Sequence, residues 1–354
     1  MQKKKFVRIA AVILIFTFAA VLIFELHRSI PTAGEMVTET ENDRKFIKWV
    51  EFDVSYSALS KALELDIKNH DSPTPTDWIT LLACLGAKYG GDFSRYQERD
   101  LLAYEKRLLD GESIEQITEK MTYFPYYSEA YGAVLGGMVG PYSLETVKSD
   151  GTKEMAETYG LKAFSPIAKG FDYSDYDDFG AGRTYGYRRR HLGHDLIGLT
   201  GTPIIAIESG IVEVMGWNQY GGWRIGIRSF DGLRYYYYAH LRQNRPYHVD
   251  LKEGEVVRAG DVIGYLGHTG YSTKENTNNI DTPHLHVGLQ LIFDPSQKEG
   301  SGEIWVNLYP LTRLLARHRS EVYRVAETKE FYRVSDFDEP ALKEYRKEQK
   351  INAQ

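Results

Sequence analysis

Apolar residues recur with the period of an α-helix between residues 44 and 142. Tyr56, Leu59, Leu63 and Ile67 are three or four positions apart, so they fall on one face of a helix. Charged residues occupy the remaining positions, as they do on the solvent face of a packed helix. The pattern predicts a small α-helical domain at residues 44–142 that carries no recognisable chemical motif, and it leaves the role of this domain open.

Capping residues indicate where individual helices begin and end. Thr76 can cap a helix over residues 77–89, and the pair Gly90-Gly91 follows it as a stop signal. Ser113 and Gln116 have the spacing of a capping box, which predicts the start of another short helix.

The pattern changes near residue 161, where short apolar and aromatic runs alternate with glycine turns. The expected strands cover residues 203–207, 210–214, 223–228, 233–239, 261–266 and 285–292. Residues 230–233, Phe-Asp-Gly-Leu, carry a tight-hairpin signal. These features predict a mainly antiparallel β-sheet or sandwich over residues 161–315. A polar connector at residues 143–160 precedes it, and a charged, partly helical tail at residues 316–354 follows.

The N-terminal 28 residues have the pattern of a membrane anchor. Lysines and Arg8 precede the apolar run 9–24, which as a helix would span about 24 Å, a little short of a hydrocarbon core of about 30 Å. Basic residues before the span predict a cytoplasmic N-terminus. We expect a cytoplasmic stub and single-pass transmembrane helix at 1–28 in the cell membrane, a linker at 29–43, and an extracellular remainder. The alternative is a cleaved signal peptide and a secreted protein, although residues 32–34 form only a weak cleavage site.

Composition excludes several classes of protein. The formal net charge of -6 argues against a nucleic-acid binder, which usually has a basic surface. Cys84 is the single cysteine, so neither an intrachain disulfide nor a cysteine zinc cluster is possible. Because Cys84 lies in an apolar run, we interpret it as a core residue. No feature of the sequence identifies a protein partner.

Three histidine-containing patches carry the candidate chemistry. In the last, His284 and His286 are two residues apart in a predicted strand, so both imidazoles lie on one face, where one can bind a metal and the other can face a ligand. In the first, His191 and Asp195 are four apart, with Gly193 between them to allow a tight turn or a close approach of another strand. Two histidines and one carboxylate leave a fourth tetrahedral position open, as in catalytic zinc sites.

The middle patch is a run of tyrosines that ends at His240. Strand alternation predicts that Tyr236, Tyr238 and His240 share one face and that Tyr235 and Tyr237 share the other. An ordinary strand with one core face accounts for most of these tyrosines. For His240, the presence of the two other patches favours a functional role.

The order H-x-G-x-D, H, H-x-H resembles the lysostaphin/LytM-type zinc metallo-endopeptidases of peptidoglycan, the glycyl-glycine and DD-endopeptidase class. The resemblance covers residues 161–315 and includes the glycine-rich stretches 201–203, 260–264 and 267–270. It implies one zinc ion held by His191, Asp195 and His286, and a catalytic pair His240 and His284. It also implies an oxyanion-stabilising tyrosine upstream, for which Tyr185 is the nearest match and Tyr187 the substitute.

The resemblance implies a zinc-dependent endopeptidase that hydrolyses peptide bonds of cell-wall peptidoglycan. The alternative is a non-catalytic cell-wall-binding or hydrolase-activating protein with a retained zinc site, but such a protein would not need His240 and His284. The polar segment 271–282 is longer than the usual family turn, and we expect it to border the substrate groove. Which peptidoglycan bond is cut stays open.

The remaining polar residues of this region receive simpler interpretations. We expect His194 to pack behind the ligand Asp195, and His248 and His268 to lie solvated in loops. We interpret Glu208 as part of a turn and not as a catalytic acid.

Overall fold

The computed structural model describes residues 37–39, 45–185 and 187–352, and the chain divides into two compact units, Met1–Trp49 and Val50–Gln354. In the first unit β1 (Val37–Glu39) pairs antiparallel with β2 (Lys45–Ile47). Residues 37–39 of the predicted linker are therefore a strand. The predicted membrane anchor at 1–28 lies outside the described residues. Among the residues that are described, no helix is both long and apolar enough to cross a membrane.

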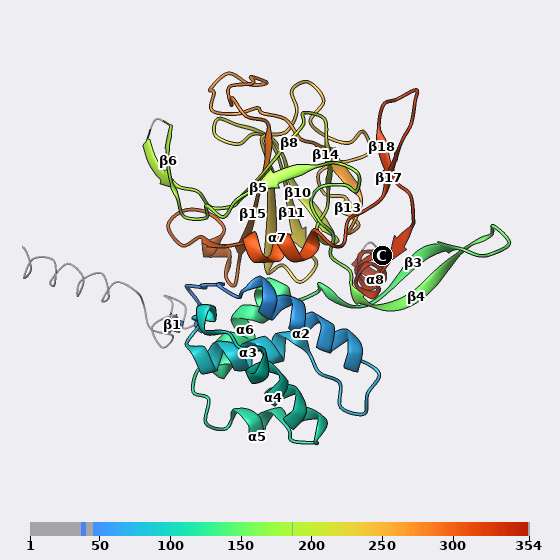
Figure 1. The fold of residues 1–354 in the computed structure, drawn as a ribbon. Helices are drawn as coiled ribbons and strands as arrows, with labels where there is room; N and C mark the ends of the chain where they lie inside the picture. Colours follow the sequence, from blue (N-terminus) through green and yellow to red (C-terminus); the bar gives the residue numbers. More distant parts are fainter. Residues whose placement is uncertain (1–36, 40–44, 186, 353–354) are drawn as a thin grey trace, which may run out of the picture. The chain divides into compact units, whose positions relative to one another are not determined.

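The predicted helical region is confirmed as a group of short helices at the N-terminal end of the second unit (Figure 1). Its elements are α2 (Tyr56–Asn69), α3 (Trp78–Tyr89), η1 (Phe93–Arg95), α4 (Glu98–Leu109), α5 (Ile114–Thr118) and α6 (Phe124–Leu135). Helix α3 packs against α2, α4 and α6. Cys84 on α3 is buried, as predicted from its apolar surroundings.

The helix ends follow the predicted capping chemistry with one shift. Asp77, and not Thr76, caps α3, because its Oδ2 accepts the Thr80 amide at 2.7 Å. Thr76 instead bonds to Asn69 and to the Leu65 carbonyl inside the helical region. A glycine in the left-handed conformation, Gly90 at φ 68°, ends α3 as expected.

Ser113 and Gln116 form the predicted capping box at the start of α5. The Ser113 hydroxyl accepts the Gln116 amide, and the Gln116 side chain accepts the Ser113 amide.

The predicted connector at 143–160 is a β-hairpin and not an irregular link. Strand β3 (Val139–Val147) pairs along its whole length with β4 (Lys153–Leu161), and β19 (Phe337–Asp338) adds to the other edge of β3. Most side chains of this hairpin are exposed or half-buried, so its sequence has no apolar alternation that would predict strands.

An antiparallel sheet forms the centre of the second unit (Figure 1). Its strands, in spatial order, are β13 (Val256–Val257), β10 (Gly210–Asn218), β11 (Gly222–Ser229), β12 (Arg234–Ala239), β15 (His284–Leu291), β8 (His194–Gly198) and β5 (Tyr173–Asp175), and β16 (Ile304–Val306) also pairs with β15. Smaller pairs are β9 (Pro203–Ile205) with β14 (Val262–Tyr265), β6 (Gly182–Tyr185) with β7 (Tyr187–Arg190), and β17 (Val322–Arg324) with β18 (Phe331–Arg333). The predicted mainly antiparallel β-architecture is therefore confirmed.

The two faces of this sheet have different roles. On β15, Leu285 and Val287 are fully buried, whereas His284 and His286 project from the opposite face, as the period of two predicts. The predicted hairpin at 230–233 joins β11 to β12, which pair antiparallel.

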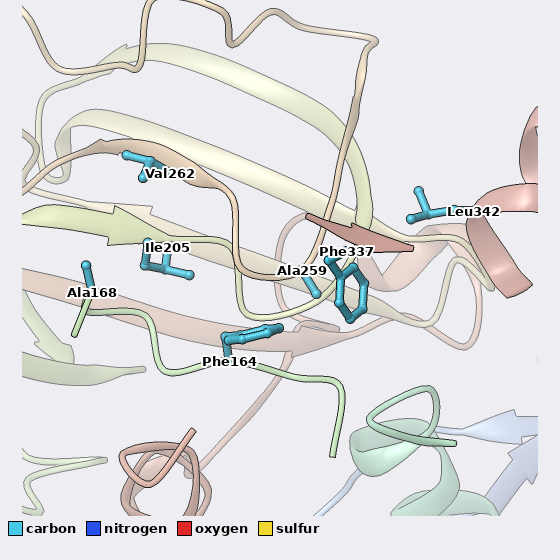
Figure 2. Close-up of a cluster of buried hydrophobic side chains, with 7 residues drawn as sticks. All are labelled: Phe164, Ala168, Ile205, Ala259, Val262, Phe337 and Leu342. Atoms are coloured by element: carbon cyan, nitrogen blue, oxygen red, sulfur yellow. The ribbon is translucent and has the colours of Figure 1, made fainter. Parts of the chain in front are cut away.

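The C-terminal tail completes the core and does not extend away from it. The elements η2 (Pro295–Gln297) and α7 (Tyr309–Leu315) precede the tail, and α8 (Pro340–Asn352) belongs to it. The tail contributes Phe337 and Leu342 to the buried apolar cluster in Figure 2. In this cluster the ring of Phe337 meets Phe164 edge-on, with centroids 5.9 Å apart. Residues 50–354 form one compact unit, which includes the predicted segment 161–315 and the tail 316–354.

Candidate metal centre and active-site cavity

His191, Asp195 and His286 come together on one face of the central sheet. His191 precedes β8, Asp195 is the second residue of β8, and the backbone register places His286 of β15 directly opposite Asp195. The Asp195 Oδ1 atom lies 2.9 Å from both His191 Nε2 and His286 Nδ1, and the two nitrogens are 3.0 Å apart. These three atoms form a group that could hold a metal ion.

Gly193 allows this close approach. A Cβ atom built on Gly193 would lie 2.5 Å from His286 Cε1 and 2.7 Å from the Val287 carbonyl oxygen. No side chain fits there, so the backbone of the first patch can pass next to β15 only with glycine at this position.

Asp178 orients His191 through the ring nitrogen that faces away from the metal-ligand group. Its Oδ1 lies 2.9 Å from His191 Nδ1, so the Nδ1–H donates to the carboxylate and Nε2 faces Asp195 and His286. Arg183 in turn donates to Asp178 and lies 3.4 Å from Asp195 Oδ2. No local pattern in the sequence distinguishes Asp178 from the neighbouring Asp172, Asp175 and Asp177, so it was not predicted.

His240 and His284 lie beside the metal-ligand group, and both are fixed by backbone carbonyls. His240 Nδ1 is 2.9 Å from the Thr269 oxygen, and His284 Nδ1 is 2.8 Å from the Thr282 oxygen. Their ring centroids are 4.7 Å apart, and His240 lies 5.9 Å from the His286 ring. Because each Nδ1–H donates to a carbonyl, each neutral ring keeps its lone pair on Nε2.

The predicted face of His240 is wrong. Tyr236 and Tyr238 are buried on the core side, where their hydroxyls bond to Glu208 and to the Ile207 amide. His240 instead lines the same cavity as Tyr235 and Tyr237. Strand β12 ends at Ala239, and the positive φ of His240, 61°, reverses the alternation at that residue.

Burial and hydrogen bonding shift the pKa values of Asp195, His286 and His240 away from their usual values. Burial raises the pKa of Asp195, but hydrogen bonds from His191 and His286 more than offset this and lower it overall. Burial lowers the pKa of His286, and burial together with the neighbouring His284 and His286 lowers the pKa of His240 well below its usual value. Ionised Asp195 and neutral His286 have the protonation states that metal ligands need. For His191, burial lowers the pKa, but the hydrogen bond with Asp195 and the nearby carboxylates more than offset this and raise it overall.

The site opens into a cavity of about 820 Å³. Its lining includes all five predicted metal-ligand and catalytic residues and the two ends of the long segment, Tyr271 and Thr282. Asn276 holds the middle of that segment, because its Oδ1 accepts from Trp223 Nε1 at 2.9 Å and from the Asn244 amide at 2.8 Å. The segment 271–282 therefore borders the cavity, as expected.

Tyr185 and Tyr187 belong to the hairpin β6–β7, where they pair with each other. Their side chains lie outside the described residues. From the same hairpin, Arg189 donates to the Tyr271 hydroxyl and contacts the Tyr271 ring at 4.8 Å, which connects the hairpin to the long segment across the cavity.

The other polar residues have structural surroundings. His194 is buried against Thr312 and Asp175, away from the cavity, as predicted. His248 is buried against Tyr332, so its predicted solvated position is wrong, because β18 covers it. His268 is half-buried and bonds to the Ile280 oxygen. Glu208 is no catalytic acid, because it forms a buried ion pair with Arg234.

Comparison with known proteins places this geometry in context. Residues 189–297 match the family described as Peptidase family M23. The chain is 39% identical over 130 residues to the L-Ala–D-Glu endopeptidase of Bacillus subtilis, which covers 37% of this chain and 38% of that protein. It is 40% identical over 97 residues to lysostaphin of Staphylococcus simulans, and the aligned stretch covers 27% of this chain and 17% of that protein. The chain thus spans less than two fifths of the length of either relative.

A larger part of the chain resembles a solved structure. A crystal structure from Ruminococcus gnavus, described provisionally as a glycyl-glycine endopeptidase LytM, is 23% identical with a TM-score of 0.52. The match covers 77% of this chain and 91% of that one. It shows a shared fold.

Proposed function

We propose that the chain is a zinc-dependent endopeptidase that hydrolyses peptide bonds of bacterial cell-wall peptidoglycan, and that residues 189–297, which match peptidase family M23, form its catalytic domain. The relatives named for L-Ala–D-Glu endopeptidase activity and as lysostaphin support this substrate class. The observation that carries the proposal is that the metal-ligand group and the pair His240 and His284 line one cavity.

The residues present fit one zinc ion. His191 Nε2, Asp195 Oδ1 and His286 Nδ1 supply two nitrogens and one carboxylate oxygen, all accepted zinc donors, with mutual separations of 2.9–3.0 Å. Zinc bound there would polarise the scissile carbonyl and lower the pKa of a water molecule towards about 7.

His240 and His284 carry the proton transfers in this proposal. The Thr269 and Thr282 carbonyls hold Nδ1–H of each ring, so Nε2 is the atom that accepts the proton of the attacking water. As the water oxygen bonds to the carbonyl carbon and the C–N bond breaks, a protonated Nε2 returns a proton to the leaving amine. Burial lowers the pKa of His240, so its ring is neutral at pH 7 and carries no proton on Nε2.

Mass spectrometry of fragments released from purified peptidoglycan by the zinc-loaded full-length chain tests the proposal. The wild type is expected to release peptide fragments. His284→Ala should keep zinc and release none, whereas His286→Ala should lose both zinc and activity. If the wild type binds zinc and releases nothing, the non-catalytic wall-binding alternative replaces the enzyme. If His284→Ala releases fragments at the wild-type rate, the proposed proton transfer is wrong.

We also propose that the chain is a single-pass membrane protein with a cytoplasmic N-terminus and an extracellular enzyme domain. The apolar run 9–24 and the basic residues before it support this arrangement. Fractionation followed by N-terminal sequencing tests it. An intact N-terminus in the membrane fraction agrees with the anchor, whereas a secreted form that starts after residue 30 supports the signal-peptide alternative.

A further inference from the structure

The cavity that holds the metal-ligand group has more cationic than anionic side chains, although the whole chain has a formal net charge of -6. The cationic residues that line it are Arg183, Arg189, Arg190, Arg224, Arg228 and Lys298, and the anionic ones are Asp195, Glu299 and Glu303. The positive charge is therefore a local property of this cavity.

Half of these cations are neutralised by carboxylates of the chain. Arg228 Nε lies 2.7 Å from Glu213 Oε2, and Lys298 pairs with the other oxygen of Glu213. Arg183 pairs with Asp178 and contacts Asp195. Arg228, Lys298 and Arg183 are therefore already paired within the chain and are poor candidates for binding a substrate carboxylate.

Arg224 and Arg189 differ from this first group. Each has a buried Nε–H that finds no hydrogen-bond acceptor among the described residues. Neither they nor the exposed Arg190 forms an ion pair within the described part of the chain. A buried guanidinium N–H without an acceptor is unfavourable, and a carboxylate is the ligand that best satisfies it.

The sheet register places Arg224 close to the reaction site. Ile225 on β11 pairs with Tyr238, so Arg224 lies across from Ala239, and Ala239 pairs with His286 on the next strand. At about 4.8 Å per strand, the Arg224 backbone is about 10 Å from that of His286. An extended peptide advances about 3.3 Å per residue, so a carboxylate at Arg224 belongs to a residue within about three positions of the scissile bond.

Resting on the proposed function, we infer that Arg224, supported by Arg189, binds a free carboxylate of the substrate. The preferred substrate is therefore an acidic stem peptide and not a neutral glycine bridge. A site built for a charge-assisted hydrogen bond discriminates against a ligand that lacks the charge. The two segments that present these arginines, β11 and the hairpin β6–β7, both line the cavity.

The test uses two stem tetrapeptides, L-Ala–D-Glu–diamino acid–D-Ala, identical except that the D-Glu α-carboxylate is free in one and a carboxamide in the other. Pentaglycine is the neutral reference. The wild type is expected to have a kcat/KM at least about tenfold higher for the free carboxylate, mainly through KM. Arg224→Gln should bring the ratio of the two values close to one, and Arg224→Lys should keep part of the preference.

Arg228→Gln is the matched control, because Arg228 lies on the same strand and lines the same cavity but is already paired with Glu213. It should keep the wild-type ratio. Urea midpoints confirm that each variant is folded. Equal cleavage of both tetrapeptides, a preference for pentaglycine, or an unchanged ratio in Arg224→Gln would overturn the inference. Absence of any fragment release from peptidoglycan would instead overturn the proposed function.

Discussion

Single residues at the site are constrained by sterics as much as by chemistry. Gly193 lies so close to β15 that even one methyl group would overlap His286. The candidate metal ligands can therefore come together only because no side chain at position 193 lies between them.

Gly193→Ala is expected to weaken zinc binding about tenfold or more. The added Cβ would meet His286 at 2.5 Å, and relief of such an overlap typically costs about 1–3 kcal/mol. Zinc titration with a chromophoric chelator measures the change. Gly182→Ala is the control, because a Cβ there meets nothing within 4 Å. Equal zinc affinity in the wild type and Gly193→Ala would contradict the steric argument.

Asp178→Asn is expected to lower zinc affinity by about 10- to 100-fold while the fold is retained. The amide keeps the shape of the side chain but loses the charge that orients His191 through its Nδ1–H. Asp177→Asn removes the same charge from the neighbouring exposed residue and should leave zinc affinity unchanged. Competition with a chelator of known affinity measures both, and an equal loss in the two variants would indicate a general charge effect.

At the residue level the sequence indicated the candidate metal ligands, but not Asp178, the residue that positions one of them. His191, Asp195 and His286 lie in two short motifs, H-x-G-x-D and H-x-H, which can be recognised locally, and the family resemblance joins them into one set. Asp178 acts across 13 positions through tertiary structure, so its sequence neighbours give no signal. The His240 side chain points into the cavity because the backbone φ of this residue is positive, at 61°, and strand alternation does not predict such an angle.

At the level of elements, the end of β12 and the start of β11 together fix the proposed proton-transfer residue. His240 donates its amide to the Gly221 oxygen and its Nδ1–H to the Thr269 oxygen. Gly270, the residue after Thr269, has a φ of 122°. A side chain at Gly270 would point at the Tyr220 oxygen and at His240 Nδ1. Three chain segments therefore meet at this histidine.

Gly270→Ala is expected to lower activity on peptidoglycan at least about tenfold while zinc content is retained. Its Cβ would lie 2.5 Å from the Tyr220 oxygen and 3.1 Å from His240 Nδ1, which displaces His240 but not the ligands. Gly232→Ala also places a side chain at positive φ, 77°, but in open space. It should keep full activity. Zinc loss in Gly270→Ala, or equal activity in both variants, would contradict this role.

Several strands with an apolar or aromatic run were predicted, whereas the polar hairpin β3–β4 was not. Each expected run falls on an observed strand, four in the central sheet and two in the separate pair β9 and β14. The hairpin β3–β4 has polar residues on both faces, so its pairing depends on backbone hydrogen bonds that polarity does not reveal.

At the scale of the whole molecule, one buried ion pair connects the helical region to the sheet. Arg234 on β12 is 1% exposed, and its Nε and Nη2 lie 2.8 and 2.9 Å from the two oxygens of Glu208. Its Nη1 donates to the Ala133 carbonyl of α6 at 3.0 Å. These partners are 26 and 101 residues away in sequence, so the single compact unit could not be predicted from local patterns.

Arg234→Met is therefore expected to destabilise residues 50–354 by about 3–5 kcal/mol, because it leaves Glu208 buried without its cation. Arg228→Met breaks the more exposed pair with Glu213 and should change the free energy of unfolding by about 1 kcal/mol or less. The double variant Glu208→Gln/Arg234→Met removes both charges and should recover part of the loss. Urea unfolding followed by tryptophan fluorescence measures all three. A loss in Arg234→Met no larger than that in Arg228→Met would mean that this ion pair does not stabilise the contact between helices and sheet.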